Sequence, residues 1–426
     1  MHDPSVYDVA VIGGGPAGAA AGTQLAKSGK KVIILEKEKF PRFCIGESLL
    51  PHGNDLLRTI GVWTKLEKSG FLQKFGAEFC TGDTNRLQRF WFKQNLGPSH
   101  EYSYQVDRSQ FDQLLLNHAR ETGCHVSEET RVISLDQSNP SLMTLSCERP
   151  EEAGGPMKIT SRWIIDASGR YAFSGSRLGL RRKSTQKKRR VAIYGHFEGV
   201  FRNSGKAAGH ITIVRIPEGW FWLIPLAGNR TSVGLVIPSE FAGTSAERGV
   251  EKIFHEMVAS TPEVNVRMRG AVGLQPLRVT GDYSWKFSSF ATPRIILTGD
   301  AAGFVDPIFS SGIMLALKSA LRASELILRA EAAHRSLRLW ERIRYTCEVT
   351  GWMNHYARII GAFYDRAGFE VFMNPSPLLQ IPRSIARLVG GEANPGFLDR
   401  MRLNAFLLIC RVQRFWSIAP SISWLR

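Results

Sequence analysis

The stretch "YDVAVIGGGPAGAAAGTQLAKSGKKVIILEKE" constrains the fold of this chain more than any other segment. An apolar strand over 9–12 runs into glycines spaced Gly-x-Gly-x-x-Gly, followed by an alanine-rich helix that reaches about residue 27. A second strand over 31–35 ends at an acid. The glycines let the backbone approach a pyrophosphate, the helix start supplies N–H groups, and the acid can accept hydrogen bonds from ribose hydroxyls. The segment therefore predicts an α/β fold with a dinucleotide site at Gly13, Gly15, Gly18 and Glu36.

Size and composition limit the class of protein. The 426 residues, 43% of them hydrophobic and 22% charged, suffice for two or more packed units. No apolar run reaches the roughly 18 residues that cross a bilayer, and the N-terminal "MHDPSVYD" lacks the basic start of an export signal. The six cysteines form no C-x-x-C pair, which is typical of a reducing compartment. We therefore expect a cytoplasmic protein with no metal site.

The net charge of +17 favours acidic partners. Part of it lies in "RLGLRRKSTQKKRR" over 177–190, where eight of fourteen residues are basic and none is acidic. This run predicts either a solvated loop or a docking patch for an acidic protein or a phospholipid surface. Nucleic acid is not an expected partner, since no helix-turn-helix, zinc-finger or RNA-recognition motif accompanies the charge.

The C-terminal tail over 383–426 is also basic. It carries seven arginines against Glu392 and Asp399, interleaved with Phe, Leu, Ile and Trp. This pattern is typical either of a helix packed on the body or of an amphipathic helix at a membrane surface. The second alternative would make the protein peripheral to a membrane.

Three further motifs follow the glycine turn in order: "QVDRSQFDQLLLNHA" over 105–119, "IIDASGRYAFSGSRLG" over 164–179 and "TPRIILTGDAAGFVDPIFSSGIMLALKSA" over 292–320. Together with the turn they resemble the motifs of the FAD-dependent hydroxylase superfamily. The resemblance implies that Arg108 faces the flavin and that Asp300 holds the ribitol chain of FAD. It also implies a cofactor site that includes Ala17, Lys37, Arg42, Ser48, Pro307, Gly312 and Ile313.

The octapeptide "GWFWLIPL" over 219–226 adds an aromatic wall. Strand alternation predicts that Trp220 and Trp222 share one face while Phe221 takes the other. The Trp-x-Trp-x-Ile-Pro pattern, which ends at Pro225, resembles the signature of flavin-dependent halogenases. That resemblance implies that the tryptophans keep an organic substrate away from the oxygen-activated flavin, which only halide can reach. The alternative is that they are ordinary core residues.

A single lysine carries the second resemblance to halogenases. In "GFLQKFGAEF" the position of Lys74 is similar to that of the catalytic lysine in the phenol and pyrrole branch of the family. The resemblance implies that Lys74 directs hypohalous acid, made from chloride or bromide, to a small electron-rich arene that is free or bound to a carrier protein. Phe309 stands where tryptophan halogenases carry a glutamate, which favours a phenol or pyrrole over an indole. We expect halide at the N–H groups of Ser310, Ser311 and Gly312, because a helix start leaves such groups unpaired.

We predict a discontinuous organisation. The FAD-binding Rossmann-like domain is expected over 1–190 with 291–330, a strand-rich substrate domain over 191–290, and a helical region over 331–426. No separate nicotinamide site is recognisable, so we expect a flavin reductase to supply reduced FAD and, for a carrier-bound arene, an acidic acyl or peptidyl carrier protein. The protein is expected to be a monomer or a homodimer.

Three other functions remain open at this point. A flavin monooxygenase that uses NAD(P)H shares the fold, although the tryptophan pair disfavours it. A prenyl-lipid reductase of the geranylgeranyl type also shares the fold, has a similar aromatic motif and often carries a cysteine near the position of Cys44. A flavin-binding protein without enzymatic activity would leave Lys74 and the aromatic wall without a role.

Overall fold

The computed structural model describes residues 6–150, 157–184, 189–243, 249–281, 285–375 and 380–425. The first sheet among these residues has the order β7-β2-β1-β10-β9-β8, with β19 beside β10. The pairings β7-β2, β2-β1, β1-β10 and β10-β19 are parallel, and the β8-β9 hairpin continues the sheet antiparallel. The bounds are β1 (Val6–Ile12), β2 (Val32–Leu35), β7 (His125–Ser127), β8 (Arg131–Asp136), β9 (Met143–Glu148), β10 (Met157–Asp166) and β19 (Ile295–Leu297).

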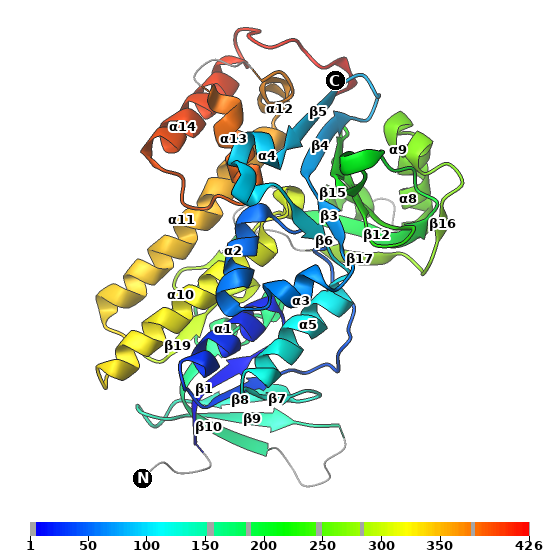
Figure 1. Cartoon of the computed structure of the whole chain (residues 1–426). Helices are drawn as coiled ribbons and strands as arrows, with labels where there is room; N and C mark the ends of the chain where they lie inside the picture. Colours follow the sequence, from blue (N-terminus) through cyan, green and yellow to red (C-terminus); the bar gives the residue numbers. More distant parts are fainter. Residues whose placement is uncertain are drawn as a thin grey trace.

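Helices cover this parallel sheet. Figure 1 shows α1 (Pro16–Lys27), α5 (Arg108–Glu121) and α10 (Gly312–Ala332) over it, and α1 packs against both of the others. All four residues of β2 and all three of β19 are buried. Parallel strands covered on both faces need continuous apolar sequences, which "VIIL" and "IIL" provide. The predicted Rossmann-like α/β fold is confirmed.

Two glycines allow the tight turn between β1 and α1. Gly13 has a φ of +102°, and a Cβ there would lie 2.5 Å from the Ala167 carbonyl oxygen. A Cβ at Gly18 would lie 1.9 Å from the Gly13 carbonyl oxygen. Glycine is therefore required at both positions for α1 to start close to the end of β1.

The second sheet has the order β16-β12-β15-β14-β13-β4-β5, with β17 beside β12. Its central strands β13 and β15 pair antiparallel with β14, whereas β13 and β4 are parallel. Two short sheets, β3-β6 and β11-β18-β20, complete the β structure. The bounds are β3 (Leu72–Lys74), β4 (Gly76–Thr81), β5 (Leu87–Trp91), β6 (Ser103–Gln105), β11 (Arg182–Ser184), β12 (Arg190–Glu198), β13 (Ile211–Arg215), β14 (Trp220–Pro225), β15 (Arg230–Pro238), β16 (Val272–Gly273), β17 (Arg278–Gly281), β18 (Trp285–Phe287) and β20 (Gly303–Phe304).

The second sheet differs from the predicted strand-rich segment in two ways. It takes β4 and β5 from residues 76–91, outside the expected range 191–290. That range also contains α7 (Ser239–Gly243), α8 (Val250–Ala259) and α9 (Pro262–Arg267), which sequence analysis missed. Phe254 of α8 packs against Phe221 on the outer face of the sheet. Short helices between turn residues carry little periodic signal, so tertiary burial decides their conformation.

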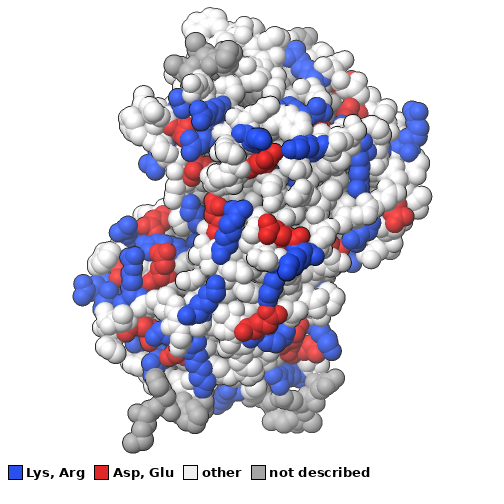
Figure 2. Space-filling view, viewed as in Figure 1, with Lys and Arg blue, Asp and Glu red and all other residues white. Residues whose placement is uncertain are grey.

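The C-terminal residues are helical as predicted. α11 (Leu339–Tyr364) packs against α10, and α12 (Arg366–Met373), α13 (Ile381–Val389) and α14 (Phe397–Val412) form the end of the molecule beside β4 and β5 (Figure 1). The remaining helices are α2 (Pro51–Ile60), α3 (Trp63–Glu67), α4 (Phe92–Leu96) and α6 (Phe173–Arg177). No helix in the described part of the chain combines the length and apolarity needed to cross a bilayer. Lys and Arg are spread over the face shown in Figure 2.

Candidate functional site

A cavity of about 390 Å³ lies where the carboxyl ends of β1, β2 and β10 meet β13 and β14. Ligands of open α/β sheets bind at this edge of the strands. The predicted cofactor residues that line it are Gly13, Gly15, Ala17, Glu36, Lys37, Arg42, Ser48, Arg108, Asp300, Pro307, Gly312 and Ile313. Gly18 is absent from the lining because it packs behind the turn, against Gly13.

The nucleotide end of the cavity fits a dinucleotide. One carboxylate oxygen of Glu36 accepts from the Gly14 N–H at 2.7 Å, and the other accepts from the Glu38 N–H at 2.9 Å. These bonds fix the carboxylate at the end of β2, where a ribose would lie. The cavity carries the cations Lys37 and Arg42 nearby, which suit a pyrophosphate.

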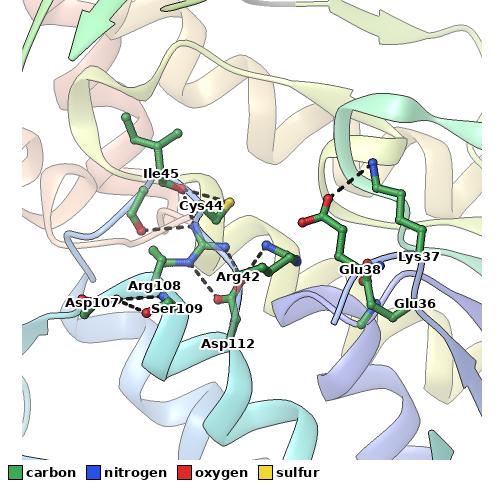
Figure 3. A network of polar contacts seen from close by, with 12 residues as sticks. Glu36, Lys37, Glu38, Arg42, Cys44, Ile45, Asp107, Arg108, Ser109 and Asp112 are labelled. Carbon is green, nitrogen blue, oxygen red and sulfur yellow. Dashed lines mark hydrogen bonds and ion pairs between the residues drawn. The ribbon is translucent and has the colours of Figure 1, made fainter. Parts of the chain in front are cut away.

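Arg108 is held by the protein on every side (Figure 3). Its Nε and Nη2 donate to the two carboxylate oxygens of Asp112, each at 2.8 Å, and Nη1 donates to the Ile45 carbonyl. Burial alone would lower the pKa of Arg108, but the Asp112 carboxylate raises it. The guanidinium therefore stays charged and ties α5 to the loop that contains Cys44, which also lines the cavity.

Asp300 lies at the opposite wall, directly after β19. Burial raises the pKa of its carboxyl to about 6, against the opposing effect of Arg170 and Arg108. The side chain is half-buried, and a carboxyl that loses part of its water is costly without hydrogen-bond donors. The hydroxyls of a ribitol chain would supply such donors, so this carboxyl also fits FAD.

The aromatic wall forms part of the cavity lining. Trp220, Trp222 and Ile224 line it, whereas Phe221 and Leu223 pack into a separate core, as the alternation predicts. Pro225 ends β14 and is absent from the cavity lining.

A glycine on the neighbouring strand makes room for one of these indoles. Trp222 pairs with Gly234 of β15, and a Cβ at Gly234 would lie 2.1 Å from Cζ2 of the Trp222 ring. The Trp222 indole N–H donates to Ser232 Oγ at 3.1 Å. The role of Gly234 was not predictable from sequence, since nothing local in β15 indicates which strand it pairs with.

Tyr364, the last residue of α11, holds the second indole. The Trp220 indole N–H donates to Tyr364 Oη at 2.7 Å, and Tyr364 Oη donates to Asp306 Oδ2 at 2.8 Å. Asp306 Oδ1 accepts from the Ile308 N–H at 3.2 Å, at the start of the turn η6 (Pro307–Phe309). This chain of bonds joins the wall to the loop before α10. No sequence motif pointed to it, because its members lie up to 144 positions apart.

The loop before α10 contains the three residues at which we expect halide. The Ser310 N–H already donates to the Pro307 carbonyl at 2.8 Å, so it is not available to halide as expected. Ser310 ends η6 with a left-handed φ of +56°, and its N–H caps that turn. Gly312 starts α10 and lines the cavity, while Ser311 is buried and lies outside the lining. Phe309 packs among Phe79, Phe363 and Phe372.

Lys74 ends β3 and is 1% exposed. Its Nζ donates to Ser48 Oγ at 2.8 Å and to the Leu49 carbonyl at 3.0 Å, and lies 5.4 Å from the centre of the Phe92 ring. Burial lowers the pKa of Lys74 to about 7. Lys74 itself does not line the cavity, but Ser48 does. The amine therefore sits one side chain behind the cavity wall, in an uncharged environment.

Residues 6–342 match the family model described as "FAD binding domain". A 1H-pyrrole-2-carbonyl-[peptidyl-carrier protein] chlorinase from Pseudomonas fluorescens is 33% identical over 77% of this chain and 76% of its own. A tryptophan 2-halogenase from Chondromyces crocatus is 33% identical over 86% of this chain and 69% of its own.

Solved structures are also similar. A flavoprotein/dehydrogenase from Cytophaga hutchinsonii superposes with a TM-score of 0.84 at 29% identity, over 96% of this chain and 100% of the other. The flavin-dependent brominase Bmp2 superposes with a TM-score of 0.83 at 26% identity, over the same shares of the two chains.

Proposed function

This chain belongs to the FAD-binding flavin-dependent halogenases, and on that premise we propose that Lys74 transfers oxidised halogen to an electron-rich arene, a phenol or a pyrrole. The observation that carries the proposal is a buried lysine with a pKa of about 7, set one side chain behind a cavity that two tryptophans line. A desolvated lysine whose pKa is lowered in this way is a candidate for a functional group.

FAD is the cofactor, and when bound it supplies the reaction with oxygen that oxidises halide. We propose that its nucleotide half lies along Gly13, Gly15 and Gly18, with Glu36 at the ribose and Arg42 near the pyrophosphate. Asp300 would accept from the ribitol hydroxyls, and Gly312 and Ile313 would lie at the flavin end, beside Pro307. The N–H at the start of α10 would attract halide there.

The wall formed by Trp220 and Trp222 selects by size. A halide ion or hypohalous acid is small compared with an arene, so indoles that close the cavity would pass the first and hold back the second. The two hydrogen bonds to Tyr364 and Ser232 fix both rings. The arene would therefore react away from the flavin.

Lys74 has a chemical route for halogen transfer. At pH 7 about half of the side chain is a neutral amine, which can attack the halogen of hypohalous acid. The N–halogen bond forms as the O–halogen bond breaks, and the oxygen leaves as water with one amine proton. An arene carbon then takes the halogen, and the ring proton returns to the nitrogen. Ser48 Oγ and the Leu49 carbonyl hold Nζ in place throughout.

The arene and the partners are inferred from Phe309 and from the basic run. Phe309 takes the place of the glutamate expected in tryptophan halogenases and packs in an aromatic cluster, which favours a phenol or pyrrole. A flavin reductase would deliver reduced FAD, and an acidic carrier protein would dock on the basic run 177–190. In that run Arg182 and Lys183 are exposed, whereas Lys187 and Lys188 lie outside the described residues. Salt should then slow turnover of a carrier-bound arene more than that of a free one, since the screening length is about 8 Å at physiological ionic strength.

The test compares Lys74→Met with Lys318→Met. Lys318 is a half-buried lysine on α10 whose Nζ lies 4.8 Å from the centre of the Trp352 ring, outside the cavity lining. With reduced FAD, oxygen and bromide, we expect Lys74→Met to oxidise the flavin at the parental rate and to give no halogenated arene. Lys318→Met should halogenate normally. Halogenation by Lys74→Met at the parental rate would assign the role to another group.

A further inference from the structure

The C-terminal helix α14 carries apolar side chains on two opposite sides. Leu403, Phe406 and Cys410 are buried against the body. The outer side and the residues after the helix expose large hydrophobic side chains, each more than half accessible: Phe397, Leu398, Met401, Leu408, Phe415, Trp416 and Ile418. We call this set the α14 surface. In Figure 2 the end of the molecule that α13 and α14 form is mostly white, with blue side chains along its border.

Part of this set forms a stripe on one helix face. Phe397, Met401 and Leu408 follow one another by four and seven residues, which is the repeat of one helix face, and Phe415 lies in the turn after α14. Exposed apolar residues are normal when they are scattered. Seven of them between residues 397 and 418 form a patch of the kind that binds another surface.

Arginines border the α14 surface. The groove between α11 and α14 is lined by Arg358, Arg400, Arg411 and Arg414. Arg414 pairs with Asp365 at 3.2 Å, whereas no ion pair or hydrogen bond of the Arg411 side chain is found within the described residues. Planar guanidinium groups suit phosphate oxygens, which they bind through paired N–H groups.

We propose that the α14 surface binds the anionic surface of a phospholipid bilayer. A helix with an apolar stripe and flanking arginines lies in the interface with the apolar side chains among the acyl chains and the cations at the phosphates. α14 has 16 residues, too few to span the bilayer. A second copy of the chain fits less well, because a two-fold contact would bring together two arginine-bordered surfaces of a protein of net charge +17. This proposal does not depend on halogen transfer.

The experiment is co-sedimentation of the FAD-loaded protein with vesicles. Vesicles of phosphatidylcholine alone are compared with vesicles that contain phosphatidylglycerol, at low and at physiological salt. We expect binding to the anionic vesicles that is at least tenfold stronger than to the neutral ones and weaker in salt. The variant Phe397→Ser, Met401→Ser, Leu408→Ser, Phe415→Ser should lose at least tenfold in binding to anionic vesicles.

A matched control carries the same kind of change elsewhere. Leu339, Trp340 and Ile343 are similarly exposed at the opposite end of α11, and replacing all three with Ser should leave vesicle binding unchanged. FAD retention confirms that each variant is folded. In the parent, brominated lipids should quench part of the tryptophan fluorescence. This part should be the emission of Trp416, so it should be missing from the Trp416→Phe variant. Equal binding by parent and α14 variant would overturn the proposal. The proposal would also be overturned if the parent does not bind vesicles and instead forms a dimer that the variant does not form.

Discussion

Replacing Lys74 with Met tests the buried lysine through stability rather than activity. Lys74 is 1% exposed, and its amine donates to two neutral acceptors, Ser48 Oγ and the Leu49 carbonyl. Burial lowers its pKa from 10.5 to about 7. Between these two pH values the unfolded chain binds one proton more than the folded protein. The free energy of unfolding of the parent must therefore rise with pH across this window.

The magnitude follows from the shift. A difference of 3.5 pH units, 10.5 minus 7, corresponds to about 5 kcal/mol at about 1.4 kcal/mol per unit. This cost of a buried ammonium is fully present below pH 7 and is lost as the pH approaches 10.5. Lys74→Met avoids it but leaves Ser48 Oγ and the Leu49 carbonyl without their donor, which costs about 1–3 kcal/mol. The variant should therefore be the more stable protein below pH 7, and its advantage should disappear as the pH rises.

The assay is urea unfolding of the FAD-free proteins at pH 7, 8 and 9, followed by circular dichroism. Lys252→Met, at an exposed position on α8, is the control and should follow the parent at every pH. We expect the difference between Lys74→Met and the parent to shrink by about 1.4 kcal/mol per pH unit. Parallel stabilities of the two proteins from pH 7 to 9 would refute a buried lysine with a lowered pKa.

Three further predictions concern the cavity. Gly15→Trp should abolish FAD binding, because the indole would fill the nucleotide end beside Arg42; retention of stoichiometric flavin, measured by absorbance, would refute the site. Tyr364→Phe should raise peroxide release at least several-fold at unchanged FAD binding, because it frees the Trp220 ring. The control is Tyr345→Phe on the same helix, which loses a hydrogen bond to the Leu297 carbonyl of β19 and should not raise peroxide release. Gly234→Val should displace the Trp222 indole and lower the ratio of halogenated product to flavin oxidised. An unchanged ratio would mean that this indole has only a packing role.

Local patterns were sufficient to predict the cofactor half of the fold. The glycine turn is encoded within about thirty consecutive residues, and each piece has one low-energy solution: a buried strand, a turn with positive φ, and a helix start. The alternation of Trp220, Phe221 and Trp222 is likewise local, since side chains of a strand alternate between faces whatever the strand pairs with.

Interactions between distant segments were not predictable in this way. The parallel pairing of β4 with β13 joins residues more than 130 positions apart, and nothing in "GAEFCT" names its partner. The hydrogen bond from Trp220 to Tyr364 and the space that Gly234 leaves for Trp222 also depend on segments that only the tertiary fold brings together. Helix starts usually leave N–H groups free, which is why the sequence predicts halide at Ser310, but this N–H caps η6 by donating to the Pro307 carbonyl.

The most direct test of halogen transfer is product analysis of the parent protein. The protein is incubated with FAD, a flavin reductase, oxygen and a panel of phenols and pyrroles, with and without bromide, and the products are examined by mass spectrometry. We predict an arene with the isotope doublet of bromine that requires bromide and is absent with Lys74→Met. A hydroxylated arene formed without halide, or saturation of an added prenyl chain with no halogenated product, would contradict the account.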